Sequence, residues 1–237
     1  MTRVDPISLR LSLGGGRVNA YLLTGEHGRV LVDTGSSCSQ SAMDKALESL
    51  LADGPALRLI LLTHGDLDHA GNAAHLSEAY NVPIAMHRAD AAMVERGDMR
   101  AGRQVRGCFL GPLGATFMGY TRGRRFTPDI HLEDRASLEE FGVEAAVLHL
   151  LGHSSGSLGV LTAEGDLLCG DLLDNRKRPM LSSLMDQESA ARITLERLRR
   201  LDVRRVYPGH GAPFSLDEVP ESGRPPRRAH RRRSKDG

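Results

Sequence analysis

Short apolar runs with strand character divide the first part of the chain. Apolar and polar residues alternate over 7–13, three glycines follow, and an apolar run continues over 18–23. This order predicts two strands that are joined as a glycine-linked hairpin. Further strands are predicted over 29–33 and over 57–62, where the nearly continuous apolar run indicates a mostly buried strand. The first part of the chain is therefore predicted to be rich in strands.

Helical spacing and a second group of strands complete the pattern. Apolar residues at helical intervals predict helices over 43–51, which ends before Gly54, and over 69–80. Residues 97–128 are rich in Gly and Arg and show no clean period, so we interpret them as an extended loop or a lid. Later segments predict strands over 143–151, 157–162, 166–169 and 204–207, and a helix over 188–201. The periodicity thus indicates a mixed α and β protein.

The composition is that of a globular protein with one large core. Of the 237 residues, 40% are hydrophobic and 26% are charged. No apolar run approaches the roughly 18 residues of a membrane span, and residues 1–6 lack the apolar stretch of a signal peptide. We therefore expect a cytoplasmic protein that does not associate with membranes. The scattered Cys38, Cys108 and Cys169 indicate neither a disulfide framework nor a thiolate zinc site, so a metal must be held by nitrogen and oxygen.

The charge is distributed unevenly along the chain. Residues 221–237 hold seven Lys and Arg against two acidic residues, a net charge of +5, whereas residues 1–220 carry −4. This tail has almost nothing apolar to bury, so we expect it to be disordered beside one domain over 1–220. The composition favours a solvated terminus, and the alternative is a phosphate-binding arm for nucleic acid.

The candidate chemistry centres on one short segment, Thr63-His64-Gly65-Asp66-Leu67-Asp68-His69. It places two imidazoles and two carboxylates directly after an apolar strand, where loops carry rigidly supported sites. This density of nitrogen and oxygen donors indicates a metal site. Three later predicted strands also run into a candidate ligand, namely His153, Asp171 and His210. A candidate ligand thus follows a predicted strand at four places in the chain, too often to be coincidental.

Taken in order, these segments resemble the motifs of the metallo-β-lactamase superfamily of metallohydrolases. The match covers roughly 18–214 through Asn19-Ala20-Tyr21-Leu22, Val32-Asp33-Thr34-Gly35, residues 63–72, residues 152–157, Gly170-Asp171 and Pro208-Gly209-His210-Gly211. The resemblance implies an α+β fold, a four-layer αββα sandwich, with a binuclear metal centre at one edge of the sheets. Its later motifs resemble the glyoxalase II and lactonase-like branch more than true β-lactamases.

In the family the cluster usually has the pattern His-x-His-x-Asp-His, and here Asp66 stands in place of the second histidine. The resemblance implies one metal held by His64, Asp66 and His153, another held by Asp68, His69 and His210, and Asp171 bridging them. Two divalent ions are expected, with zinc first. Because the Asp66 carboxylate is a harder, anionic donor than an imidazole, iron and manganese stay open as alternatives. Asp66 has an alternative role as an acceptor that orients a ligand imidazole. Asp33, in a tight Asp-Thr-Gly turn, is expected to support the site rather than bind the metal.

The implied activity is hydrolysis of an ester, thioester, lactone or related carbonyl bond by a water that two metals activate, with Asp68 as the catalytic residue. The helical domain with which glyoxalase II binds glutathione does not follow, which weakens acylglutathione cleavage. The short spans between His153, Asp171 and His210 leave no room for the inserted domain of nucleic-acid-processing branches. With 4% aromatic residues there is also little surface for stacking bases. A small-molecule substrate is therefore predicted, and nucleic acid is not.

Two alternatives from other classes stay open. A mononuclear iron oxygenase of the persulfide dioxygenase type shares the fold that this chain resembles, and it would bind a single iron and consume oxygen. A non-catalytic effector-binding protein would keep the metal as structure and recruit an anionic partner with its basic tail. The full ligand set argues against the second alternative, because a structural site needs no open position.

Overall fold

The structure is a computed structural model that describes residues 1–11, 15–103 and 124–223. Most of the loop predicted over 97–128 lies outside the described residues, and so does the predicted tail from 224 onward. The first residues of that tail are still tied to the fold, because the Gly223 carbonyl accepts a hydrogen bond from the Leu181 N–H at 2.8 Å. No helix within the described ranges is long and apolar enough to cross a membrane.

The first sheet contains six strands among the described residues, in the order β1-β2-β3-β4-β5-β6. These are β1 (Arg3–Arg10), β2 (Arg17–Thr24), β3 (Arg29–Val32), β4 (Leu57–Leu61), β5 (Ile84–Met86) and β6 (Ile130–His131). The first two strands form the predicted hairpin, antiparallel from Arg3 opposite Thr24 to Arg10 opposite Arg17. From β3 to β6 the strands are parallel, so the segments that follow β3, β4 and β5 leave the sheet at the same edge.

The second sheet contains four strands in the described part of the chain, in the order β12-β9-β8-β7. These are β7 (Ala145–His149), β8 (Leu158–Thr162), β9 (Asp166–Gly170) and β12 (Arg205–Pro208), and a short ladder pairs β10 (Leu173–Asp174) with β11 (Met180–Leu181). Because β8 is antiparallel to both β7 and β9, and β12 is parallel to β9, three strands run the same way. The carboxyl ends of β7, β9 and β12 therefore lie at one edge.

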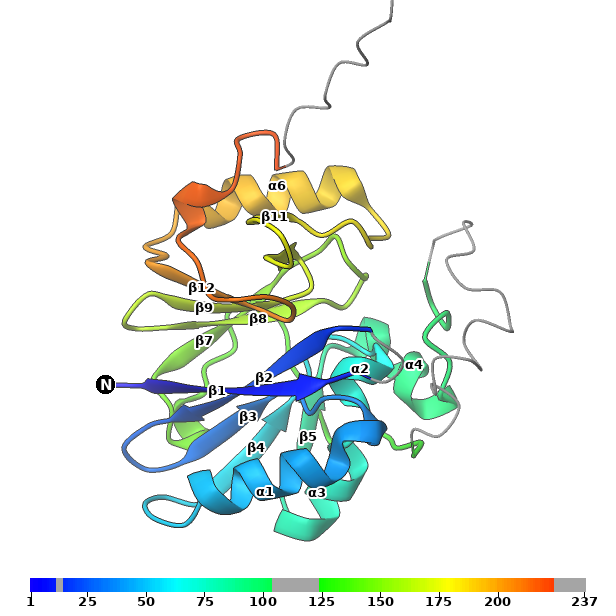
Figure 1. The fold of residues 1–237 in the computed structure, drawn as a ribbon, viewed down its shortest axis with the longest axis vertical. Helices are drawn as coiled ribbons and strands as arrows, with labels where there is room; N and C mark the ends of the chain where they lie inside the picture. Colours follow the sequence, from blue (N-terminus) through cyan, green and yellow to red (C-terminus); the bar gives the residue numbers. More distant parts are fainter. Residues whose placement is uncertain (12–14, 104–123, 224–237) are drawn as a thin grey trace, which may run out of the picture.

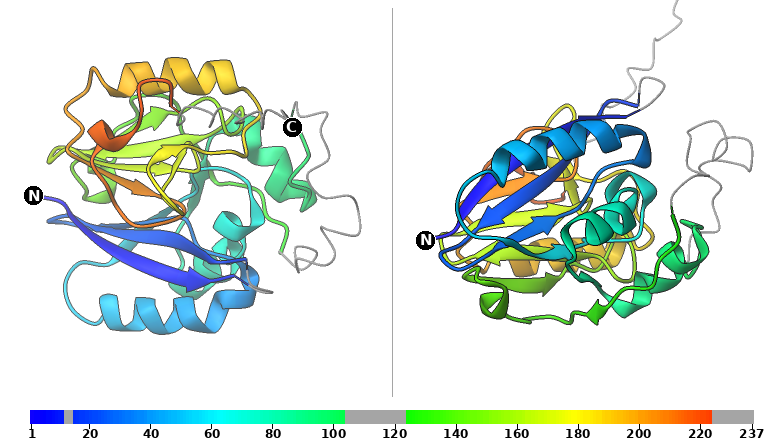
Figure 2. Two further views of the ribbon diagram at one scale, coloured as in Figure 1. Left: turned by 45° about the horizontal axis from the view of Figure 1, so that its top comes forward. Right: turned by 90° about the horizontal axis from the view of Figure 1, so that it is seen from below.

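Helices cover the outer face of each sheet (Figures 1 and 2). On the first sheet these are α1 (Gln40–Leu50) and α3 (Ala73–Tyr80), and on the second sheet α6 (Glu188–Leu198). The shorter helices are α2 (Leu67–Ala70) and α4 (Ala91–Arg96), with 3-10 turns η2 (Ser37–Ser39), η3 (Arg88–Asp90), η5 (Glu139–Phe141) and η6 (Leu216–Glu218). The order helix, sheet, sheet, helix is the predicted four-layer αββα sandwich.

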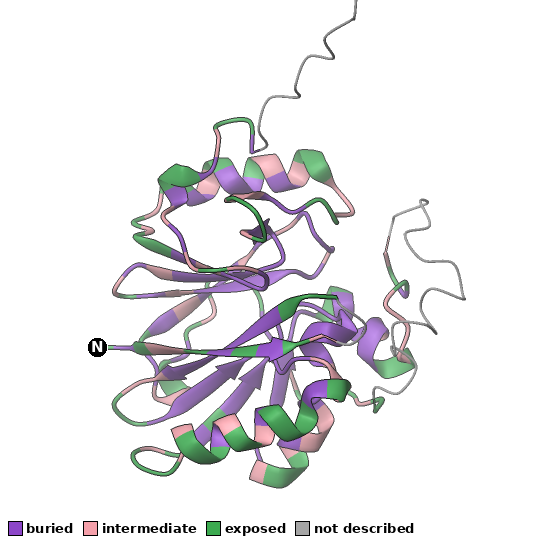
Figure 3. Cartoon of the chain, in the orientation of Figure 1, coloured by how far each residue is buried: buried purple, intermediate pink, exposed green. Residues whose placement is uncertain are grey.

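Three apolar clusters fill the spaces between these layers, and the strands of both sheets are largely buried (Figure 3). Strand β2 shows how one strand serves two of them, since successive side chains point to opposite faces. Leu22 packs in the cluster under α1 and α3, whereas Tyr21 and Leu23 pack between the sheets. Burial on both faces explains why residues 20–23 of this strand form a continuous apolar run.

The single helix predicted over 69–80 is wrong, because the structure contains two helices, α2 and α3, separated at Gly71 and Asn72. A Cβ on Gly71 would lie 2.5 Å from the Leu67 carbonyl oxygen and from the Ser37 nitrogen, so this turn needs glycine. The Asn72 amide donates hydrogen bonds to the carbonyl of Thr34 at 2.7 Å and of Ser36 at 3.0 Å. The break thus ties the ligand-bearing segment to the turn after β3.

Candidate metal centre

The segment after β4 presents four of the predicted ligands. His64 and Asp66 lie in the turn that leaves the strand, whereas Asp68 and His69 lie in α2. Hydrogen bonds from the N–H groups of His69 and Ala70 to the Asp66 carbonyl, both 2.9 Å, fix this change of direction. Because the backbone changes from extended to helical, His64 and Asp66 point toward one position and Asp68 and His69 toward another.

The edge of the second sheet supplies the other three ligands. His153 follows β7, Asp171 directly follows β9, and His210 follows β12. Two backbone hydrogen bonds join the sheets beside them: Leu158 N–H donates to the Thr63 carbonyl at 2.7 Å, and Asn19 N–H donates to that of Gly209 at 2.8 Å. All seven predicted ligands are buried. The fold therefore brings together residues from 64 to 210.

The first cluster consists of His64, Asp66 and His153. The Asp66 Oδ2 lies 3.1 Å from the His153 Nε2 and 3.7 Å from the His64 Nε2. One ligand atom from each residue lies within 4.8 Å of the others, close enough to share one ion. The carboxylate that replaces the family's usual histidine thus faces both imidazoles of the cluster.

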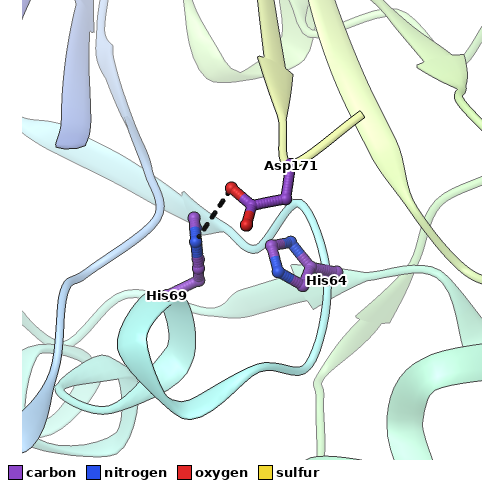
Figure 4. A group of neighbouring side chains, drawn as sticks. All are labelled: His64, His69 and Asp171. Atoms are coloured by element: carbon purple, nitrogen blue, oxygen red, sulfur yellow. Dashed lines mark ion pairs between the residues drawn. The ribbon is translucent and has the colours of Figure 1, made fainter. Parts of the chain in front are cut away.

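The second cluster consists of Asp68, His69 and His210, and Asp171 joins it to the first. The His210 Nε2 lies 3.4 Å from the Asp68 Oδ2 and 3.5 Å from the Asp171 Oδ2. The other Asp171 oxygen, Oδ1, lies 3.3 Å from the His69 Nε2 (Figure 4). Asp171 also forms a group with His64 and His69 whose ligand atoms lie within 4.8 Å of one another. Its carboxylate therefore lies between the two clusters.

The four imidazoles share one orientation, in which Nδ1 contacts the protein and Nε2 faces the centre. The Nδ1 partners are the Thr63 hydroxyl for His64 (2.8 Å), Asp33 for His69 (2.8 Å), the Leu184 carbonyl for His153 (2.6 Å) and the Arg17 carbonyl for His210 (2.7 Å). A carbonyl or carboxylate oxygen can only accept, so Nδ1 carries the proton and Nε2 keeps its lone pair. This is the tautomer that a metal ligand needs.

Asp33 supports ligands of both clusters. Its Oδ1 accepts the Thr63 N–H at 2.8 Å, and its Oδ2 accepts the Thr63 hydroxyl and contacts the His69 Nδ1, both at 2.8 Å. Because its proton is given to Asp33, the Thr63 hydroxyl accepts from the His64 Nδ1. Asp33 has a φ of 60°, a left-handed conformation that aspartate and asparagine tolerate better than most residues. One carboxylate thus sets the tautomer of His64 and His69.

The donor set fits a divalent metal ion. Among the described residues, the His64 Nε2, the His69 Nε2 and the Asp171 Oδ1 are buried polar atoms without a hydrogen-bond partner. Such atoms are rare and costly in folded proteins, and here they converge on one point. Imidazole nitrogen and carboxylate oxygen are ligands of zinc, iron and manganese. A metal centre satisfies all three atoms.

The surroundings of the centre lower the pKa of His64 and raise the pKa of His69. Burial, together with the neighbouring His69 and His153, lowers the pKa of His64, which stays neutral as a ligand must. Burial also disfavours the charged form of His69, but Asp171, Asp33 and Asp68 outweigh it and raise the pKa of His69 well above its ordinary value. The carboxylates therefore draw a proton or a metal ion to the same place.

Arg103 is a residue of the site that the sequence analysis missed. It lies at the end of the described part of the predicted loop, and its guanidinium donates to the Asp66 Oδ1 at 2.8 Å. Although burial raises the pKa of Asp66, its contact with His153 and the charge of Arg103 outweigh this effect, so the pKa of Asp66 lies well below its usual range. No spacing pattern links position 103 to the ligand motif, and the loop's lack of period concealed it.

Asp90 is a second residue that the sequence analysis missed. Its carboxylate accepts hydrogen bonds from the Ser154 hydroxyl at 2.6 Å and from the Gly156 N–H at 2.9 Å. Burial raises the pKa of Asp90, although these two hydrogen bonds oppose the shift. Asp90 thus holds the loop that carries His153 against the η3 turn.

Cys169 belongs to the core and not to the centre. Its side chain is buried in the cluster under α6, and its thiol contacts the Gly170 and Leu173 carbonyl oxygens at 3.6 and 3.9 Å. Burial raises the pKa of this thiol far above its ordinary value, so it stays protonated and a poor nucleophile.

Comparison with known proteins places this geometry in a family. The metallo-beta-lactamase superfamily profile matches residues 13–210. The chain is 30% identical over 153 residues to a hydroxyacylglutathione hydrolase of Anaeromyxobacter dehalogenans (strain 2CP-C), covering 65% of this chain and 45% of that protein. It is 26% identical over 237 residues to the acyl-coenzyme A thioesterase MBLAC2 of Homo sapiens, covering 90% of this chain and 80% of that protein.

Coverage of two of the relatives is partial. The chain covers 45% of the hydroxyacylglutathione hydrolase and 58% of the beta-lactamase-like protein 2 homolog of Drosophila melanogaster, which is about half the length of these curated relatives.

Solved structures show the same fold. TTHA1623 in a di-iron-bound form is 30% identical, with a TM-score of 0.67 and coverage of 90% of this chain and 95% of that chain. The metallo-beta-lactamase family protein TTHA1429 from Thermus thermophilus is 25% identical, with a TM-score of 0.69 and coverage of 90% and 74%. The predicted family and the predicted four-layer α+β fold are both confirmed. The chain belongs to the metallo-beta-lactamase superfamily.

Proposed function

We propose that this protein is a metal-dependent hydrolase with a binuclear centre that cleaves an ester, thioester, lactone or related carbonyl bond. One observation carries the proposal: buried, unpartnered imidazole and carboxylate atoms converge where the two sheets meet. The ligands of one ion would be His64, Asp66 and His153, those of the other Asp68, His69 and His210, with Asp171 shared.

An acyl thioester is the substrate class that the relatives favour. One is named as a hydroxyacylglutathione hydrolase and another as an acyl-coenzyme A thioesterase. Both names describe removal of an acyl group from a thiol carrier by water. We therefore infer that thioesters are hydrolysed faster than oxygen esters or lactones.

The chain's own residues divide the chemistry between them. When bound, divalent ions polarise a carbonyl oxygen and lower the pKa of water. Asp68 orients the attacking water and accepts its proton, since its Oδ2 faces the centre, 3.4 Å from the His210 Nε2. The neighbouring imidazoles keep their proton on Nδ1, so they hold their places without entering the proton transfer. Cys169 supplies no nucleophile, because its thiol is buried and protonated.

Zinc is the first metal to test, and iron has specific support. Asp66 replaces a nitrogen donor by an oxygen donor, which suits harder ions than a three-histidine set does. The similar structure TTHA1623 is described in a di-iron-bound form. Elemental analysis of the purified full chain measures both the identity and the number of ions.

The test combines metal analysis with a substrate panel of acyl thioesters, oxygen esters, lactones and a persulfide. We expect two ions per chain, thioester hydrolysis that a chelator abolishes and added metal restores, and a loss of about 10²–10⁴-fold in Asp68→Asn. Asp129→Asn is the matched control. This carboxylate accepts a hydrogen bond from the Ile84 N–H at 2.8 Å, and it has no contact with the proposed ligands.

Three outcomes would refute the proposed function: metal-independent hydrolysis, near-normal turnover by Asp68→Asn, or a single iron with oxygen consumption on the persulfide. The last result would identify the protein as an oxygenase instead.

A further inference from the structure

Arg103 is bound at three points beside the first cluster. Its Nη1 donates to the Asp66 Oδ1 at 2.8 Å, its Nε to the Asp186 Oδ1 at 2.9 Å, and its Nη2 to the His153 carbonyl at 2.8 Å. The side chain is 16% exposed and lies between the two carboxylates. This guanidinium is therefore a fixed part of the site and not a mobile surface charge.

Asp186 anchors the guanidinium to the segment that carries His153. Its side chain is fully buried, and its backbone N–H donates to the carbonyls of Gly152 at 3.0 Å and His153 at 3.1 Å. Arg103 contacts the same segment through the His153 carbonyl. A planar fork of fixed N–H groups can satisfy these three directions at once, which the single ammonium of lysine cannot do.

The fork divides the two oxygens of Asp66 between different partners. Oδ1 is bonded to Arg103, whereas Oδ2 faces the Nε2 atoms of His153 at 3.1 Å and His64 at 3.7 Å. One carboxylate oxygen is thus left to bind an ion. The guanidinium also offsets the negative charge that Asp66 brings in place of a neutral imidazole.

We propose that Arg103 is a positioning residue that restricts Asp66 to one metal-binding oxygen and so keeps a coordination position open for water or substrate. The inference rests on the ligand set of the proposed function. A carboxylate free to turn can bind an ion through both oxygens, which fills one position more. Catalytic sites keep such a position open, whereas structural sites fill it. Arg103 therefore lets an aspartate act where the family usually has a histidine.

The test is the absorption of the Co²⁺-loaded protein in the visible range, which weakens as coordination number rises. Arg103→Lys keeps the charge and loses the fork, and Arg103→Met loses both. We expect both variants to absorb more weakly than the wild type at equal Co²⁺ content. The control is Arg124→Lys, which alters an exposed arginine that donates to both Glu78 oxygens at 2.7 and 2.6 Å, and we expect it to match the wild type.

The outcomes separate this inference from the proposed function. If the wild type binds two Co²⁺ ions and both Arg103 variants keep its spectrum, Arg103 does not restrict Asp66 and the inference is overturned. If the wild type binds no ion at the first cluster, the proposed ligand set itself fails. Circular dichroism and the absorption of Co²⁺ at the second cluster confirm that each variant is folded. The second cluster serves as this reference because the side-chain hydrogen bonds of Arg103 go to Asp66, Asp186 and His153.

Discussion

Asp33→Asn removes one charge from beneath the metal centre and keeps the shape of the side chain. Asparagine tolerates the positive φ at this position, and its oxygen can still accept the Thr63 N–H. Its amide nitrogen then takes the place of Oδ2, the oxygen that contacts the His69 Nδ1 and accepts the Thr63 hydroxyl proton. An N–H donor would thus face two other donors.

The conflict is resolved by moving protons on two ligands. The His69 Nδ1 becomes an acceptor, which places the proton on Nε2, the atom that must bind the ion. The Thr63 hydroxyl, now an acceptor from the amide, donates to the His64 Nδ1 and shifts that imidazole in the same way. One substitution therefore puts a proton on a metal-binding nitrogen in each cluster.

The magnitude follows from the hydrogen bonds that are lost. A buried hydrogen bond to a charged group contributes about 1.5–3 kcal/mol. Supporting contacts of this kind change metal affinity by about 10- to 100-fold. We expect Asp33→Asn to lower the affinity for both ions by about this factor, measured by competition with a chromophoric chelator. The control variant Asp129→Asn should bind both ions with wild-type affinity. Wild-type affinity for both ions in Asp33→Asn, despite an intact fold, would refute the tautomer argument.

Three further substitutions or reagents test other parts of the centre. Asp66→His restores the family's commoner donor set and should shift bound metal toward zinc, and unchanged elemental analysis would count against Asp66 as a ligand. Gly209→Ala puts a Cβ 2.3 Å from the Asp171 Oδ1. We therefore expect loss of bound metal and a free energy of unfolding lowered by about 1–3 kcal/mol, measured as a lower melting temperature. Burial raises the pKa of Cys169 and keeps its thiolate scarce at pH 8. After alkylation of the folded protein, peptide mapping should therefore show modified Cys38 and unmodified Cys169. Labelling of Cys169 would show instead that its strand opens.

The sequence predicts most of the longer elements and misses the shortest strands, for a physical reason. Helix α1 has enough residues to show a helical period, and strand β2 has enough for its apolar run to be recognised. Strand β5 has three residues and β6 has two, which is too few to show a period. Strand β5 forms by pairing with β4, and β6 forms by pairing with β5. The break between α2 and α3 depends on close approach of backbone from the turn after β3, a long-range contact that local propensity does not record.

The candidate site divides in the same way. Its seven proposed ligands stand in motifs at the ends of strands, so the sequence could name all of them as candidates, and the structure places them close together. The supporting residues carry no such signal. Asp90, Arg103 and Asp186 act on segments distant in sequence, and only the fold shows which loop each one contacts.

The centre is also where the two sheets are joined, which links metal binding to the closure of the sandwich. His64, Asp66, Asp68 and His69 follow a strand of the first sheet, and the other three proposed ligands follow strands of the second. Backbone hydrogen bonds from Leu158 to Thr63 and from Asn19 to Gly209 cross between the sheets beside them. An ion held by both sheets binds the folded state alone, so its binding free energy adds to that of folding. If the proposed ions bind, they would offset the repulsion among the carboxylates at this edge and help to hold the two sheets together.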